Sequence, residues 1–247
     1  MKYLISFLFL ALAFSMKSEA KVTLPSILGD NMVLQQQAEV KLWGKARPNA
    51  TVTVKTSWNG QTYKSSSDDK GGWSLTVSTP VAGGSYKITF NDGELLTLQN
   101  VLIGEVWFCS GQSNMEMPMG GFDRQPVRGT NDIIAKAKPS TPIRMYTTDS
   151  KDGRWVRQFS KTPQEDCQGE WLENTPVNVS HISAVSYYFA RYIQEVLEVP
   201  VGIVVSTWGG SKVEAWMSRE SIKPFSSIDL STVSYTHLRA HETCADL

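Results

Sequence analysis

The sequence predicts an α/β fold with a parallel sheet, preceded by a small β-sandwich-like module. Between residues 21 and 100, short runs of alternating apolar and polar residues are separated by turn residues. This pattern is typical of a small antiparallel sandwich. Beyond residue 100, nearly continuous apolar runs flank a helical segment. Such runs are typical of parallel strands that are covered on both faces.

Four strands are predicted in the β-rich module, residues 21–100, each from its period-two alternation. They are residues 40–43, 51–55, 73–77 and 86–90. Glycine and asparagine turn signals separate them, and no helical periodicity of useful length occurs. Because alternating strands use one face for the core and one for solvent, we expect the chemistry to lie outside this module.

Residues 101–232 are expected to form the N-terminal part of an incomplete α/β domain. The apolar run 101–108 predicts a strand covered on both faces, and it leads into a polar turn at 109–114. Further along, residues 131–138 predict a short helix and residues 143–146 a short strand.

A longer helix is predicted after Ser183, which is a good N-cap residue, and Pro200 ends it. One face of this helix is predicted to be apolar. That face consists of Val185, Tyr188, Phe189, Tyr192, Ile193 and Val196. A second buried strand, 201–205, follows and leads into the glycine-rich loop 206–211. Since the carboxyl ends of parallel strands meet at one sheet edge, this loop and the turn 109–114 are expected to lie together.

Charge and cysteine usage exclude several classes of function. Lys+Arg and Asp+Glu both number 24, so there is no basic field that would hold nucleic acid. No cluster of cysteine and histidine has metal-ligand spacing, and we expect neither a metal nor an organic cofactor. Cys109 and Cys167 could pair in an exported protein, although nothing in their spacing demands it. The oligomeric state is not predictable from the sequence.

Both ends of the chain are expected to differ from the folded part. Residues 1–20 have a charged start, an apolar run and small residues at the expected cleavage site, so they predict a signal peptide. We therefore expect a secreted or periplasmic protein with no membrane association after cleavage. Residues 233–247 resemble the translation of a transposase sequencing adapter. We expect this tail to be non-native, which removes His237 and His241 as catalytic candidates.

Two polar segments carry the candidate chemistry. Ser113 lies in a tight turn after a buried strand, which is a recurring position for a serine nucleophile. The alternative is a plain solvated turn serine. Gly209 and Gly210 can present unobstructed N–H groups to a tetrahedral oxyanion. The alternative is a strand-to-helix turn that needs flexible glycines.

Together these segments resemble the sialate O-acetylesterase family. The resemblance rests on Gly111-Gln-Ser-Asn-Met115 and on Ser206-Thr-Trp-Gly-Gly-Ser-Lys-Val-Glu-Ala-Trp216, and it extends over residues 22–230. It implies an SGNH-hydrolase-like α/β/α sandwich. It also implies removal of O-acetyl groups from sugars, either sialic acid or xylan-type glycans, through an acetyl-serine intermediate.

Carried over residue by residue, the resemblance assigns Ser113 as the nucleophile and Gly209 or Gly210 to the oxyanion hole. It makes Gln112 and Asn114 the residues that flank the serine and hold the turn or the acetyl group. Glu214 and Trp208 would position the substrate.

The catalytic machinery is expected to be incomplete. The family's Asp-x-x-His would lie beyond residue 232, so we expect the catalytic His and Asp to be absent and the chain to be nearly inactive. His181 matches no catalytic histidine of the family.

Two other functions are compatible with the sequence. The first is a non-catalytic carbohydrate-binding protein on the same scaffold, which the β-rich module and the eight tryptophans would allow. The second is a lipase or thioesterase of the same fold. Gln112, Asn114 and Glu214 argue against this second alternative, because a long acyl chain needs an apolar trough.

Overall fold

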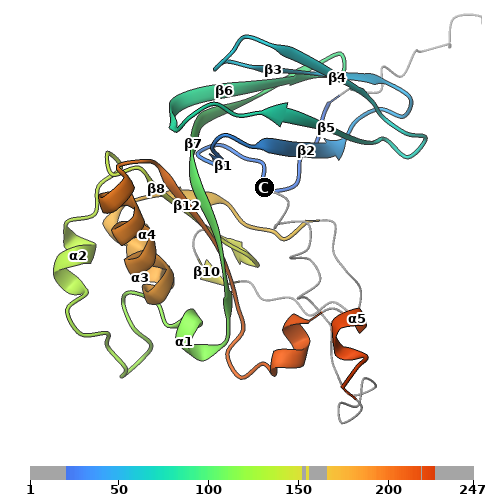
Figure 1. The fold of residues 1–247 in the computed structure, drawn as a ribbon. Coiled ribbons are helices and arrows are strands. Elements are labelled where there is room, and N and C mark those ends of the chain that lie inside the picture. The colour runs from blue at the N-terminus through green and yellow to red at the C-terminus, as the bar shows by residue number, and fades with distance from the viewer. Residues whose placement is uncertain (1–20, 152–153, 156–165, 218, 226–247) are drawn as a thin grey trace, which may run out of the picture.

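Strand β7 (Leu95–Gly111) runs through both halves of the molecule and joins them (Figure 1). We describe residues 21–151, 154–155, 166–217 and 219–225 of a computed structural model. The predicted signal peptide and the predicted non-native tail lie outside these residues. The main sheet has the order β11-β8-β12-β7-β6-β3-β4, with β1 (Val33–Gln35) also paired to β7.

The first half of β7 belongs to the β-rich part. It pairs antiparallel with β6 (Gly83–Asn91) and parallel with β1. Asn100 has a φ of 54° in the middle of β7. This left-handed conformation is one that asparagine tolerates better than most residues. The predicted module boundary at residue 100 therefore falls inside one continuous strand, at a local irregularity of its backbone.

The remaining strands of the β-rich part form two hydrogen-bonded groups. In the main sheet, β3 (Thr51–Thr56) pairs with both β6 and β4 (Thr62–Ser66). In a separate pair, β2 (Glu39–Lys45) lies antiparallel to β5 (Gly72–Ser78). All four predicted strands of this region are confirmed. Their inward residues form one core, which includes Val40, Leu42, Val52, Val54, Trp73, Ile88 and Phe90.

The α/β part is built on three parallel strands. These are the second half of β7, β12 (Val201–Thr207) and β8 (Ile143–Thr147), with β12 in the middle. Strand β11 (Trp171–Glu173) adds to β8 in the antiparallel direction. Residues 201–205 of β12 are buried, as their continuous apolar run predicts, and Ser206 is buried as well. The predicted α/β class with a parallel sheet is therefore correct.

Three helices gather beside the parallel strands (Figure 1). Helix α4 (Ala184–Leu197) begins after Ser183, whose hydroxyl accepts a hydrogen bond from the Ser186 N–H, so the predicted N-cap is confirmed. Helix α3 (Pro176–His181) precedes it, and α2 (Asn131–Ala135) is shorter than predicted. No helix among the described residues is long and apolar enough to cross a membrane.

The shorter elements lie between the main strands or after them. The helical turn α1 (Ser113–Glu116) follows β7, and η1 (Val213–Trp216) and α5 (Arg219–Ile222) follow β12. A small hairpin consists of β9 (Ser150–Lys151) and β10 (Arg154–Trp155).

Five of the six residues on the predicted apolar face of α4 point outward, contrary to the usual expectation, whereas Ile193 is half-buried and packs against the core. Tyr192 is 67% exposed, and Val185, Tyr188, Phe189 and Val196 are also exposed. The residues of α4 that are buried are Ala184, Ser186, Tyr187 and Ala190. Most of these are small, so the helix backbone can lie close to the sheet. In the described structure, sheet packing therefore selects the small-residue face.

The second half of β7 is also more exposed than predicted. Trp107 is 42% exposed and Phe108 39%. Beyond residue 104, the described strands pair with β7 on the β12 side alone. The Trp107 ring packs edge-on against Phe189 of α4, with ring centroids 5.0 Å apart. The prediction that residues 101–108 are covered on both faces therefore holds for 101–104 and fails for Trp107 and Phe108.

Candidate active site

Ser113 lies at the carboxyl end of β7, in the first position of α1. Its turn is closed by two backbone hydrogen bonds, from Glu116 N–H to the Gln112 carbonyl (2.9 Å) and from Met117 N–H to the Ser113 carbonyl (3.1 Å). Gly111 has a φ of 152°, and a Cβ there would lie 3.2 Å from the Met115 Cβ. The strand thus reverses sharply into a helical turn, and Ser113 is left exposed at the sheet edge.

Contacts from the start of helix α4 hold this turn in place. The Met115 sulfur accepts hydrogen bonds from the hydroxyls of Ser186 (3.3 Å) and Ser183 (3.6 Å). The Ala184 N–H donates to the Met117 carbonyl at 2.8 Å. The start of α4 therefore fixes α1, and with it the position of the Ser113 backbone.

Strand β12 brings the glycine-rich loop beside Ser113. Its register pairs Thr207 with Gly111, and the Trp208 N–H donates to the Gly111 carbonyl at 3.0 Å. The expectation that the turn 109–114 and the loop 206–211 share one sheet edge is confirmed.

A buried carboxylate connects the two segments. Glu116, in the last position of α1, is 7% exposed, and its Oε2 accepts a hydrogen bond from the Gly209 N–H. A Cβ on residue 209 would lie 3.2 Å from the same oxygen, so this close approach favours glycine. Sequence reasoning gave Glu116 no role. The signal that could have found it is an acid three residues after the serine, on the same helical turn.

The contact changes the assignment of the oxyanion donors. In this structure the Gly209 N–H is engaged by Glu116, so it is not free to bind an oxyanion. Gly210 is exposed, and a Cβ there would meet nothing within 4 Å. Its φ of 77° is in the region that favours glycine. Of the two predicted donors, Gly210 is therefore the one that borders open space.

The rest of the loop is held by its own side chains. The Ser211 hydroxyl donates to the Trp208 carbonyl at 2.7 Å and accepts from the Trp216 indole N–H at 2.9 Å. Trp208 is half-buried, and Glu214 is half-buried at the start of η1. Both predicted substrate-positioning residues thus belong to the segment that β12 delivers to the serine.

Gln112 and Asn114 flank Ser113 and are exposed. Within the described part of the chain, neither side chain forms a hydrogen bond, so both can face a bound molecule. His181 is exposed at the end of α3, outside the two segments that form the site.

Cys109 is the other nucleophile type near this edge. Burial raises the pKa of its thiol, and a hydrogen bond with Ser186 partly offsets that effect. The thiol is therefore protonated at neutral pH, and the thiolate is the reactive form. Cys109 and Cys167 are not joined by a disulfide bond to each other in the described structure. Among the described residues, no three His, Cys, Asp or Glu side chains cluster as a metal site would require.

An exposed serine thus lies at the end of one parallel strand, beside a glycine loop at the end of the next, in the arrangement that the sequence predicts for a serine esterase. The fold agrees, because it superimposes on the crystal structure of a carbohydrate acetylesterase from Xanthomonas citri. That match has a TM-score of 0.76 at 32% identity and covers 90% of this chain and 49% of that chain.

The chain is also similar in sequence to sialate O-acetylesterases. Sialate O-acetylesterases of Pongo abelii and Homo sapiens are each 29% identical to it over 216 residues, and that of Mus musculus is 27% identical over 213 residues. These matches cover 80% of this chain, which spans 38–39% of the relatives' length. No protein-family model matches the chain.

Proposed function

We propose that this chain carries the nucleophile and the oxyanion loop of a serine esterase that removes O-acetyl groups from sugars. One observation carries the proposal: Ser113 is exposed at the end of β7 and lies beside the glycine-rich loop 206–211. The hydrogen bond from the Trp208 N–H to the Gly111 carbonyl holds the two segments together. The names of the related proteins support a carbohydrate acetyl ester as the substrate class. Sialic acid and xylan-type glycans are the candidate carriers of the acetyl group.

The proposed reaction is a two-step acyl transfer. The Ser113 Oγ attacks the acetyl carbonyl while a histidine takes its proton. The backbone N–H groups of Ser113 and Gly210 hold the oxyanion, and each such donor is worth roughly 3 kcal/mol in the transition state. The histidine then protonates the departing sugar oxygen, and water hydrolyses the acetyl-serine.

The histidine and its aspartate are proposed to lie in the part of the family that this chain does not span. Without a base, a serine hydroxyl stays protonated and is a weak nucleophile. We therefore expect this chain by itself to be nearly inactive, with a residual rate supported by binding and the oxyanion donors.

Polar side chains around Ser113 favour a sugar ester over a lipid ester. Gln112 and Asn114 flank Ser113 and are exposed, and Glu214 lies in η1 after the glycine-rich loop 206–211. We propose that these three residues and Trp208 position the sugar. The protein is further proposed to reach the periplasm or the medium after removal of residues 1–20. Subcellular fractionation would test the location, and N-terminal sequencing of the mature protein would test the removal of residues 1–20.

The substrate class is tested with the full-length gene product, read from genomic DNA across residue 232. Acetylated xylo-oligosaccharide, O-acetylated sialic acid, and acetate and octanoate nitrophenyl esters are compared. The proposal expects acetate release from at least one sugar and faster cleavage of the acetate than of the octanoate ester. Faster cleavage of octanoate would favour a lipase. Sugar binding without any acetate release would favour the non-catalytic carbohydrate-binding protein.

A further inference from the structure

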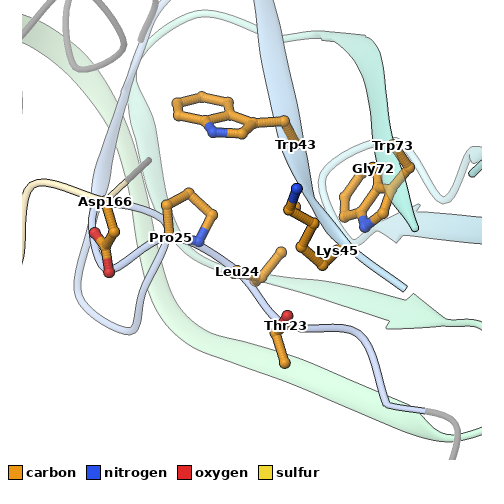
Figure 2. Close-up of a pocket in the computed structure, with 9 residues that line it drawn as sticks. Thr23, Leu24, Pro25, Trp43, Lys45, Gly72, Trp73 and Asp166 are labelled. Atoms are coloured by element: carbon orange, nitrogen blue, oxygen red, sulfur yellow. The ribbon is translucent and has the colours of Figure 1, made fainter. Parts of the chain in front are cut away.

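A pocket of about 390 Å³ lies in the β-rich part, between β2, β5 and the segment that precedes β1 (Figure 2). The residues that define it are Leu24, Pro25, Trp43, Lys45, Trp73 and Asp166. None of them belongs to the Ser113 turn or to the loop 206–211. The pocket therefore has no part in the proposed esterase reaction.

The apolar walls of the pocket are preformed. Thr23 and Lys45 exchange two backbone hydrogen bonds of 2.9 Å, which fix the segment 23–25 against β2. A Cβ on Gly44 would lie 2.3 Å from the Thr23 carbonyl oxygen, so the close approach requires glycine. Trp73 is 4% exposed, whereas Trp43 is half-buried and presents its ring to the open space.

Two charged groups border the same space. Figure 2 shows the Asp166 carboxylate on one side, beyond Pro25, and the Lys45 side chain on the other, below Trp43. The Asp166 Oδ1 accepts from the Ser26 N–H (2.9 Å), the Ser26 hydroxyl (2.5 Å) and the Gln168 N–H (3.2 Å). The carboxylate is thus held in place, and within the described structure Oδ2 has no hydrogen-bond partner.

The ligand must match both kinds of wall. A purely apolar ligand would cover the Asp166 carboxylate without pairing its Oδ2, which is costly. A sugar ring has an apolar C–H face that can lie on an indole and hydroxyls at its edge that can bond to charged groups. The volume is near the lower end of the roughly 300–1,000 Å³ range of small-molecule sites, which limits the occupant to one or two rings.

We propose that this pocket is a glycan-binding site that takes one or two sugar rings, one of them stacked on Trp43 and hydrogen-bonded by Asp166. Such a site would hold a glycan on the β-rich part independently of the chemistry at Ser113. It requires neither the nucleophile nor a general base.

The test uses this chain with Ser113→Ala, so that no turnover can affect the result. Xylotetraose, cellotetraose and N-acetylneuraminic acid are titrated by calorimetry and by tryptophan fluorescence. The expected result is saturable binding of at least one probe, weakened at least tenfold by Trp43→Ala. The matched control is Trp58→Ala, which removes a half-buried tryptophan of the same β-rich part outside the pocket and should leave the affinity unchanged.

A second variant keeps the proposal testable if Trp43→Ala fails to fold. Asp166→Asn preserves an acceptor for Ser26 but removes the charge, and it should weaken binding severalfold without changing the melting temperature. The proposal is overturned if the parent binds none of the three probes at millimolar concentration. It is also overturned if folded Trp43→Ala or Asp166→Asn binds as tightly as the parent. Esterase activity is measured separately on the full-length protein, so neither result depends on the other.

Discussion

The backbone N–H of Gly209 donates a hydrogen bond to the Glu116 carboxylate, and this contact ties the glycine loop to the turn that carries Ser113. Glu116 is buried and lies on the same short helical turn as the serine. We interpret it as a positioning residue that sets the distance between the nucleophile and the remaining donor, Gly210. Small displacements in such an arrangement can cost about a hundredfold in rate.

Two substitutions of Glu116 should distinguish its role as a hydrogen-bond acceptor from the effect of its negative charge. In the full-length protein, Glu116→Ala is expected to lower kcat about a hundredfold with little change in KM, because the loop loses its anchor. Glu116→Gln keeps an oxygen acceptor for the Gly209 N–H and should recover most of that loss. Steady-state kinetics on a soluble acetyl ester measure both. Equal activity of the alanine and glutamine variants would show that the hydrogen bond does not position the loop.

The two loop glycines should respond differently to alanine. Gly209→Ala puts a Cβ 3.2 Å from the Glu116 oxygen, so we expect it to displace the carboxylate and to reproduce the kinetic defect of Glu116→Ala. At Gly210 there is room for a Cβ, but the φ of 77° is strained for alanine by roughly 1–2 kcal/mol. Urea unfolding should detect that loss of stability for Gly210→Ala. A Gly210→Ala variant as stable as the parent would contradict the described backbone.

The half-buried thiol of Cys109 should make the free energy of unfolding depend on pH in the alkaline range. Burial raises its pKa in the folded state, so the folded protein binds the proton more tightly than the unfolded chain does. The resulting stabilisation is fully present below the unfolded thiol pKa of about 8.5. It is lost as the pH rises through the higher folded value.

Urea unfolding of the parent and of Cys109→Ser between pH 7 and 10.5 checks this dependence. The parent should lose more free energy of unfolding above about pH 8.5 than the serine variant does. Site-resolved alkylation by iodoacetamide should also be slow at Cys109 at pH 7.5. Rapid alkylation at that pH would mean that the thiol is not desolvated.

Exposed apolar side chains on α4 and β7 should cause self-association of this chain. Trp107 of β7 packs against Phe189 of α4, Tyr192 lies on the same helix, and contiguous apolar patches promote association. Tyr192→Lys is expected to shift size-exclusion elution toward the monomer. It should also reduce the binding of a fluorescent dye that reports exposed apolar surface. The matched control is Leu95→Lys, which also replaces a residue that is 67% exposed but lies in the β-rich half. The same benefit from both variants would indicate a general effect of charge.

Much of the fold follows from local patterns in the sequence. Apolar and polar residues alternate in β2, β3, β5 and β6 because each strand has one buried and one exposed face, so these strands are predictable. The hydroxyl of Ser183 caps α4 because the bond is formed within one turn. The adjacency of the two active-site loops is predictable as well, since parallel strands place their carboxyl ends together.

Other features depend on contacts that no local pattern records. Strand β7 continues past Asn100 because its two halves find partners far apart in the sequence. The buried face of α4 is selected by how closely the helix approaches β12, and its apolar periodicity pointed to the opposite face. The hydrogen bond between Glu116 and Gly209 joins residues 93 positions apart and requires the register of β12 against β7. Sequence reasoning therefore singled out Gly209 but could not predict its contact with Glu116.

The most direct test of the central claim is acetate release from a chromogenic acetyl ester by the full-length protein, beside its Ser113→Ala and Ser110→Ala variants. Ser110 is an exposed serine in the same strand and serves as the matched control. We predict that Ser110→Ala retains nearly full activity and that Ser113→Ala loses at least about a thousandfold in kcat. Comparable activity of the Ser113→Ala variant and the parent would contradict the assignment of Ser113 as the nucleophile.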